Sequence, residues 1–476
     1  MEHWILVVSF AALLSGVFIF KKLWLGALLA ILILLINKIA LSQLNDFYFS
    51  IANGSIISLE LGVLLLGAYL FYNILLSNNH FDGLQTVFSN YSSRFSVVLI
   101  LCLFMGSFME GIAGFGIPAM LIAPLMLATG FKPLTSIVLP LAATVSAVTF
   151  GALGTPLKIG LNVTSTDATS FNTICLNMIP AFITPFVLAF LYSKSEDIRM
   201  DYKKEWKLLA GAGACFAIPY FVTGYFNIEY PSVVAGAAGL LLFNLFFIPK
   251  KDITSLRWWY KLFWPYGLLV GLLVILKALS SQFSFTIHDQ LRTINFFQPG
   301  IVFILTAIIV ALIQSPSNAF MRILDQSKVT VVRIGQSLVT IFLLVCFTQI
   351  INSDFSGFMN AAFGNVKQQM LLAIIPVTGI AGSFITGSAT MSNLLLNGWV
   401  QSTSSLSYLP VSMALLNTGG AVGNAISLQN IIMVKSVINT DESEGKVVRL
   451  NLMVVFAYLF FLIASMLAIV YLSGAY

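Results

Sequence analysis

The chain has 476 residues, of which 58% are hydrophobic and only 9% are charged, and its mean hydropathy is +0.95. Soluble domains carry about 25% charged residues, so this composition excludes a soluble globular protein and indicates a polytopic membrane protein. We interpret the net charge of +6 as loop lysines and arginines that set orientation in a lipid bilayer, and not as a sign of nucleic-acid binding.

The first apolar stretch, Trp4–Phe20, is not followed by a small-residue cleavage site, and we expect it to remain as the first span. The four cysteines lie in apolar stretches without paired or metal-binding spacing. The three histidines lie at or outside the ends of these stretches. We therefore predict neither a metal site nor a cofactor. The sequence also lacks a recognisable nucleophile–base pair, so we do not predict an enzyme.

A transmembrane helix needs about 20 consecutive apolar residues. The stretches that approach this requirement are, in chain order, Trp4–Phe20, Leu23–Leu41, Ile56–Leu76, Ile174–Tyr192, Leu208–Phe226, Pro231–Ile248, Tyr260–Leu279, Phe296–Ile313, Ile334–Ile351 and Leu450–Leu472. Two longer apolar regions, at about 96–160 and 370–438, contain many glycines and polar residues. The fold class that we predict is all-α, with about 12 or more transmembrane helices.

Loops rich in lysine and arginine alternate with loops that are poor in them, and the rich loops are expected to be cytoplasmic. Both termini then lie outside. Arg94, which precedes the first complex region, is cytoplasmic in this scheme, whereas Gln369, which precedes the second, is external. The two regions therefore enter the membrane from opposite sides, which is typical of an inverted-topology repeat.

This scheme divides the chain into two repeats and a connector. Residues 1–193 form the first repeat, with a core of broken helices at about 96–160. Residues 194–257 form a connector of two transmembrane helices, and residues 258–476 form the second repeat, with its core at about 370–438. Broken helices at corresponding positions of two halves indicate the binding site of a secondary transporter.

The first core centres on Glu110, the only acid between Ser96 and Phe131. An acid inside a membrane protein indicates a functional group, and we interpret it as a site of proton or cation coupling. The alternative is a structural acid that is capped by backbone amides or paired with a lysine. Gly114 and Gly116 let the backbone break and approach a ligand, although small residues also serve close helix packing.

The second core repeats the beginning of this motif, because Gly106–Gly111 (GSFMEG) is matched by Gly382–Gly387 (GSFITG). Polar residues then follow at a density that indicates a water-accessible cavity. The candidate binding residues in this core are Thr386, Ser388, Thr390, Asn393, Asn417, Thr418 and Gln429. The alternative is that these side chains form hydrogen bonds between helices.

One lysine follows each core motif at a similar distance: Lys158 lies 48 residues after Glu110, and Lys435 lies 49 residues after Thr386. We predict that both bind an anionic substrate, or that one of them pairs with Glu110. The alternative is that each lysine extends toward the membrane surface from a helix end.

The motifs FMEGIAGFGIPA, GFKPL, FGALGTP, GSFITGSATMSN and NTGGAVGNAISLQNI together resemble the lactate permease family, whose members import lactate or glycolate into bacteria with protons. This resemblance implies a multi-pass protein of the bacterial cytoplasmic membrane, with Glu110 as the proton-coupling acid. It also implies a site lined by Gly114, Gly116, Ser388, Thr390, Asn393, Asn417, Thr418 and Gln429.

The chain departs from the family pattern at several polar positions. Ala389 stands where the family usually has Asp or Asn, and the segments Thr144–Ala147 and Ser427–Gln429 also differ from it. Lys158 and Lys435 stand where apolar or small residues are usual. We therefore expect a more anionic substrate, such as a dicarboxylate or a sulfonate. Sodium coupling, export and an anion channel remain alternatives, and the sequence makes no prediction of oligomeric state.

Overall fold

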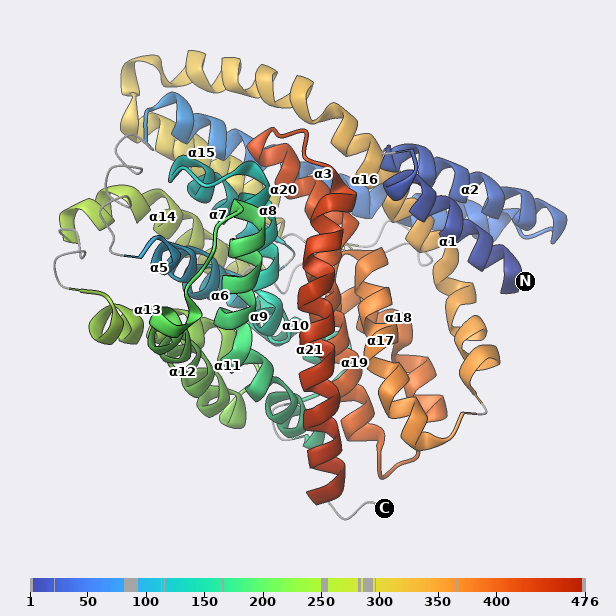
Figure 1. Cartoon of the computed structure of the whole chain (residues 1–476). Helices are drawn as coiled ribbons and strands as arrows, with labels where there is room; N and C mark the ends of the chain where they lie inside the picture. The colour runs from blue at the N-terminus through green and yellow to red at the C-terminus, as the bar shows by residue number, and fades with distance from the viewer. Residues whose placement is uncertain are drawn as a thin grey trace. The chain divides into compact units, whose positions relative to one another are not determined.

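The computed structural model describes residues 3–20, 22–80, 93–112, 114, 116–164, 167–249, 256–280, 284–285, 294–295, 297–364 and 366–472 (Figure 1). Within these ranges the chain is almost entirely helical. Two strands of two residues each, β1 (Ser284–Phe285) and β2 (Ile294–Asn295), pair antiparallel. The chain forms two compact units. Unit 1 comprises Met1–Asp82, Leu256–Phe358 and Lys435–Gly445, and unit 2 comprises Gly83–Ser255, Met359–Val434 and Lys446–Tyr476.

Unit 1 is built mainly from long helices. They are α1 (His3–Phe18), α2 (Leu23–Ala40), α3 (Leu44–Ser77), α14 (Leu256–Ser280), α15 (Pro299–Gln314), the short η2 (Pro316–Asn318) and most of α16 (Ala319–Phe363). Glycines set the closest contacts: a Cβ atom on Gly16 of α1 would lie 2.7 Å from the Cα atom of Gly26 of α2. Close approach of backbones at small residues is how helices associate where lipid removes the hydrophobic driving force.

Unit 2 contains both regions in which broken helices are expected. The first part comprises α5 (Arg94–Val98), η1 (Leu99–Met105), α6 (Gly106–Ile112), α7 (Ile117–Ala128), α8 (Pro133–Ala143), α9 (Val145–Val148), α10 (Gly151–Lys158), α11 (Ala168–Glu196), α12 (Tyr202–Phe226) and α13 (Pro231–Phe247). The second part comprises α17 (Gln368–Thr386), α18 (Ala389–Thr403), α19 (Leu409–Gly423), η3 (Asn424–Ile426) and most of α20 (Leu428–Ile438) and α21 (Glu444–Leu472).

Eight of the described helices are long and apolar enough to cross a membrane, or nine if the bent pair Pro316–Gln336 and Leu338–Ile351 forms one span. Six shorter apolar helices of 10–17 residues accompany them. The prediction of a polytopic α-helical membrane protein is confirmed. The expected number of 12 or more transmembrane helices and the opposite direction of the two repeats stay predictions, as do the boundaries of the two repeats and the connector.

Two segments that the sequence suggests as loops are helical. Helix α3 begins at Leu44 and so includes most of the polar stretch before Ile56, and α16 runs through the basic stretch Arg322–Arg333. Neither helical stretch contains a proline, and α3 buries Phe47 within the segment before Ile56. A hydropathy window detects residues that suit lipid, whereas a helix continues through polar residues as long as nothing breaks its hydrogen bonds.

Candidate functional site

The first GSF motif lies directly after a π-helix. The segment η1 is fully buried and leads into α6, which ends at Ile112, two residues after Glu110. Short π-helical segments occur frequently at functional sites. Helix α13 packs directly on α6, because a Cβ atom on Gly111 would lie only 2.6 Å from the backbone nitrogen of Val233. This close packing fixes the position of Glu110.

Left-handed glycines interrupt the helices shortly after the first GSF motif and at the end of the second. Gly114 and Gly116 have φ values of +64° and +76° before α7 begins at Ile117. In the second motif α17 ends at Thr386, Gly387 has φ of +74°, and α18 begins at Ala389. Glycine adopts this conformation without the steric cost that other residues have. A break at left-handed glycine therefore accompanies each motif, although it comes later in the first, where Gly111 at the position of Gly387 is still helical.

A further break follows α9, where three consecutive residues are left-handed. Ala152, Leu153 and Gly154 have φ values of +47°, +58° and +74°. Two of the three are not glycine, and left-handed residues of this kind cost about 1–2 kcal/mol each. Such strained backbone clusters at functional sites and persists only where the surrounding packing enforces it. Here Gly114 supplies part of that packing, because a Cβ atom on it would lie 2.8 Å from the Ala152 Cβ atom.

Side chains from other helices bind carbonyl oxygens next to this break. The Tyr220 hydroxyl donates to the Ser146 carbonyl oxygen at 2.6 Å, and the Ser232 hydroxyl donates to the Ala147 carbonyl oxygen at 2.7 Å. Helix ends leave backbone acceptors without intrahelical partners. Both bonds hold the end of α9 in place, and the second adds to the bond that the Ala147 carbonyl oxygen already accepts from the Phe150 N–H at 3.1 Å.

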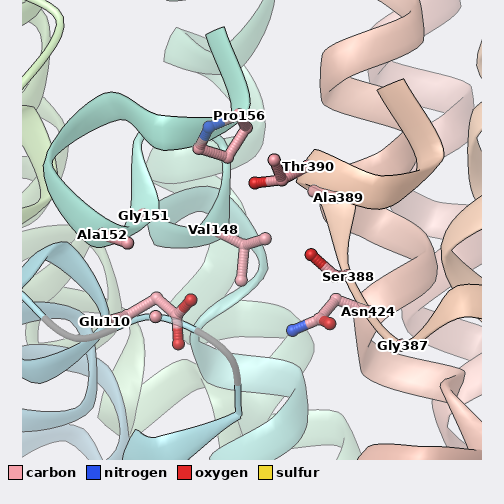
Figure 2. Close-up of a pocket in the computed structure, with 11 residues that line it drawn as sticks. Glu110, Val148, Gly151, Ala152, Pro156, Gly387, Ser388, Ala389, Thr390 and Asn424 are labelled. Atoms are coloured by element: carbon pink, nitrogen blue, oxygen red, sulfur yellow. The ribbon is translucent and has the colours of Figure 1, made fainter. Parts of the chain in front are cut away.

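The breaks surround one pocket within unit 2, with an empty volume of about 290 Å³ including the part that opens to solvent (Figure 2). Its lining residues come from both core regions: Glu110, Gly114, Val148, Gly151, Ala152, Pro156, Gly387, Ser388, Ala389, Thr390 and Asn424. Figure 2 shows the Glu110 carboxylate facing the same space as the Ser388 hydroxyl and the Asn424 amide. Polar groups of several types thus converge on a small site with apolar walls, which is the usual composition of a small-molecule site.

Glu110 is the acid of this pocket and is 3% exposed. No hydrogen bond or ion pair joins its carboxylate to any of the residues that the structure describes. A largely buried carboxylate without a protein partner is suited to take up a proton or a bound cation from the pocket. In the same described part of the chain, no cluster of three or more His, Cys, Asp or Glu side chains is arranged to hold a metal ion.

A chain of buried amides and hydroxyls connects the two core regions beside the pocket. The Asn393 amide donates to the Asn417 Oδ1 atom at 2.8 Å and to the Pro156 carbonyl oxygen at 3.0 Å. The Asn417 amide in turn donates to the Thr149 carbonyl oxygen at 3.2 Å. These bonds join α18 and α19 to the strained segment after α9, and all the side chains involved are buried.

The network continues through a residue of α11. The Thr149 hydroxyl donates to the Asn177 Oδ1 atom at 3.2 Å, and the Asn177 amide donates to the Thr418 hydroxyl at 2.9 Å. Asn177 is 1% exposed and lies in a long apolar helix. Buried polar networks of this kind specify one arrangement of the helices that they join.

Apart from the two lysines, the residues predicted from the sequence fall into three groups in the structure. Gly114, Ser388, Thr390 and Glu110 line the pocket. Asn393, Asn417 and Thr418 belong to the buried network. The remaining three lie at the breaks of the helices: Gly116 is next to Asn430, Gln429 is next to Gly387, and the Thr386 hydroxyl donates to the Ser388 carbonyl oxygen at 3.1 Å.

The two predicted lysines each pair with a glutamate. Lys158 forms an ion pair with Glu229, which lies between α12 and α13, and both side chains are partly exposed. Lys435, in unit 1, pairs with Glu444 at 2.5 Å. Neither lysine is among the residues that line the pocket. Their role in substrate binding stays a prediction.

Several lining residues are not among the sequence-predicted ones. They are Val148, Gly151, Ala152, Pro156, Ala389 and Asn424. A signal was present for some of them, because the motifs FGALGTP and NAISLQNI include Gly151, Pro156 and Asn424. Asn177 of the supporting network has no such signal, since it is the one amide within the otherwise largely apolar stretch Ile174–Tyr192.

Broken helices around a small polar pocket in a multi-pass protein are characteristic of membrane transporters. A family model described as L-lactate permease matches residues 6–260 and 268–473. The chain therefore belongs to the L-lactate permease family, whose members are transporters and not enzymes. This family membership, with the apolar helices, makes it a multi-pass protein of the bacterial membrane.

The chain is similar to bacterial proteins that are named lactate or glycolate permeases. A putative L-lactate permease of Haemophilus influenzae is 25% identical over 406 residues, which cover 73% of this chain and 75% of that protein. The L-lactate permease of Bacillus subtilis is 24% identical, over 83% of this chain and 82% of that protein. The glycolate permease GlcA of Escherichia coli is 28% identical, over 48% of this chain and 42% of that protein.

Proposed function

We propose that this chain is a secondary active transporter that imports lactate or a related small carboxylate with protons across the bacterial cytoplasmic membrane. The observation that supports this most directly is the position of Glu110. It is a buried acid in a pocket that both core regions line, and it has no partner among the described residues. The names of the related lactate and glycolate permeases support a small carboxylate as the substrate.

Glu110 is proposed to carry the coupled proton. A carboxylate that shares a small pocket with an anionic substrate repels that substrate unless it is neutralised. Binding of a proton to Glu110 therefore favours binding of the substrate, and the proton and the substrate cross the membrane together. Release of either one on the far side weakens the binding of the other, as linkage between two sites requires.

The substrate carboxylate is proposed to bind on the side of the pocket where α18 begins. Ser388, Ala389 and Thr390 line the pocket at the N-terminus of this helix, and Ser388 is its N-cap residue. Free backbone N–H groups and the positive end of the helix dipole favour an anion at such a place. The Asn424 amide and the two hydroxyls supply further hydrogen bonds to the carboxylate or to a neighbouring hydroxyl group.

The composition of the pocket favours a substrate with one negative charge over the more anionic substrate that the sequence departures suggest. None of the residues that line it is a lysine or an arginine, and one of them is an acid. A second negative charge on the substrate would have no cationic partner on these walls. We therefore place L-lactate and glycolate before dicarboxylates and sulfonates as substrates.

The proposal includes two inverted repeats with both termini outside. The breaks at the two GSF motifs support a repeat, because left-handed glycines precede a new helix in each case. Gly114 and Gly116 lie three and five residues after the end of the first motif, and Gly387 is the last residue of the second. Opposite entry of the two cores into the membrane is supported by the distribution of basic residues in the sequence.

Transport into liposomes that contain only this protein and a trapped pH dye tests the function. L-lactate, glycolate, a dicarboxylate and a sulfonated acid are offered in turn, with and without sodium. We expect acidification of the interior with lactate or glycolate, independent of sodium and faster at lower external pH. A response only to a dianion, or only in sodium, would contradict the proposal.

The Glu110→Gln variant tests the role of the acid. It should abolish acidification and proton-driven accumulation, while exchange of labelled for unlabelled substrate persists. Glu60→Gln is the matched control, because Glu60 is also an acid in an apolar helix but does not line the pocket. Full proton coupling in Glu110→Gln would refute the assignment of the coupling acid.

A further inference from the structure

Part of the pocket's lining is apolar and lies beside its polar groups. Val148 and Ala389 line it and are 4% and 3% exposed, respectively. In Figure 2 the isopropyl group of Val148 projects into the space between Glu110 and Ser388. A ligand that bonds to the polar groups therefore places its remaining atoms against Val148 and Ala389.

These two residues form a packed wall. Together with Ala421 of α19, which is fully buried, they make one hydrophobic cluster. Gly420 lies directly behind Ala389, since a Cβ atom on Gly420 would be 3.4 Å from the Ala389 Cα atom. Protein interiors are close-packed and yield little to added volume. The apolar side of the pocket consequently has a defined depth.

We propose that Val148 and Ala389 determine substrate specificity, by contacting the alkyl group of a 2-hydroxy acid and limiting its length. This inference rests on the proposed transport of small carboxylates. Glycolate has no alkyl group at its second carbon and lactate has one methyl group, so these two acids place the fewest carbons against the wall. Longer 2-hydroxy acids place further carbons where the Val148 side chain lies.

The wall differs in kind from the polar groups that bind the carboxylate. Hydrogen bonds orient an acid in the pocket, and they are the same for glycolate, lactate and their longer relatives. Discrimination among these acids depends on the apolar volume beside the second carbon. One methylene group in a hydrophobic pocket changes discrimination by about 10–200-fold.

The test is exchange transport in liposomes with glycolate, L-lactate, L-2-hydroxybutyrate and L-2-hydroxyvalerate. Val148→Ala removes two carbons from the wall and should raise the ratio of 2-hydroxybutyrate to lactate transport (kcat/KM) by about tenfold. Ala389→Gly widens the wall from α18 and should shift the ratio in the same direction. This second variant decides the question if Val148→Ala does not yield a monodisperse protein.

Val145→Ala is the matched control, because it makes the same deletion three residues earlier in α9. Val145 is 1% exposed and does not line the pocket. An unchanged ratio in the control and a raised ratio in Val148→Ala or Ala389→Gly support the proposal. Lactate transport with no change in chain-length preference in either variant, or an equal change in the control, overturns this inference alone. If the unmodified protein transports none of the four acids, both this inference and the proposed function fail.

Discussion

The carboxylate of Glu110 lies against the backbone of Gly151, so that a Cβ atom on Gly151 would stand 3.0 Å from the Glu110 Oε1 atom. Gly151 directly precedes the strained segment Ala152–Gly154, whereas Glu110 lies in α6. The absence of a side chain at position 151 therefore makes room for the acid. Glycine is used where another group must approach the backbone closely.

Gly151→Ala should impair proton coupling more than it impairs stability. The added methyl group crowds the Glu110 carboxylate and forces it to move within the pocket. We expect the substrate-driven acidification of liposomes to fall several-fold, while the melting temperature of the detergent-solubilised protein changes little. Gly335→Ala in α16 is the control, because nothing lies within 4 Å of the added atom there. Equal acidification by both variants would contradict this expectation.

Gly387→Ala should weaken both folding and transport. The residue is left-handed, and a Cβ atom on it would lie 2.7 Å from the Gln429 Oε1 atom. The backbone cost is about 1–2 kcal/mol, and the contact with Gln429 adds to it. Gly398→Ala in α18 is the matched control, because no described atom lies within 4 Å of its added Cβ atom. Alanine stabilises a helix interior relative to glycine, so this control should not lose stability. A Gly387→Ala variant with the melting temperature and the transport rate of the unmodified protein would refute the prediction.

Removal of the bond between Asn393 and Asn417 should cost stability in a non-additive way. Asn393→Ala leaves the Pro156 carbonyl oxygen without the Asn393 donor, and Asn417→Ala does the same to the Thr149 carbonyl oxygen. Each variant should lose about 1–3 kcal/mol of unfolding free energy. The double variant should lose less than the sum, because the two side chains share one bond.

This double-mutant cycle is measured by denaturation of the purified protein in detergent. Asn244→Ala is a suitable control, since its amide donates only within its own helix, to the Leu240 carbonyl oxygen at 2.8 Å. Strict additivity of Asn393→Ala and Asn417→Ala would show that the bond does not couple α18 to α19.

The ion pair of Lys158 and Glu229 offers a test of the lysine's role. If Lys158 acts by holding the end of α10, then Lys158→Glu and Glu229→Lys should each slow transport modestly and the double charge exchange should restore it. Partly exposed pairs contribute about 0–1 kcal/mol, so single losses of up to about fivefold are expected. A double variant that stays as impaired as Lys158→Glu would instead favour direct contact of this lysine with the substrate. Initial rates of lactate uptake distinguish the two outcomes.

Much of the candidate site could be predicted from the sequence because its signals are local. An acid among glycines is conspicuous within an apolar, membrane-spanning stretch, and so is a run of hydroxyl side chains such as Thr386–Asn393. The pocket accordingly contains Glu110, Gly114, Ser388 and Thr390. The left-handed glycines at both GSF motifs follow from the same local logic.

Residues with ordinary local signals were assigned less well. Val148 has the same apolar character as many residues of its region, and Ala389 is one small apolar residue inside a polar run, so nothing in the chain marks either as a wall of the pocket. Asn393 and Asn417 have a polar character that suits a ligand, yet in the structure they bind each other and distant backbone carbonyl groups.

The sequence by itself determined that this protein is a polytopic transporter with broken helices, because composition and backbone freedom are properties of each segment. Only the tertiary structure decided which partner each polar group has. Asn393 and Pro156 are 237 positions apart, and Asn177 and Thr418 are 241 positions apart. The choice of partner depends on which segments pack together, and a donor's own neighbours along the chain do not encode it. The same dependence on packing places Lys158 beside Glu229 and Val148 beside Ala389.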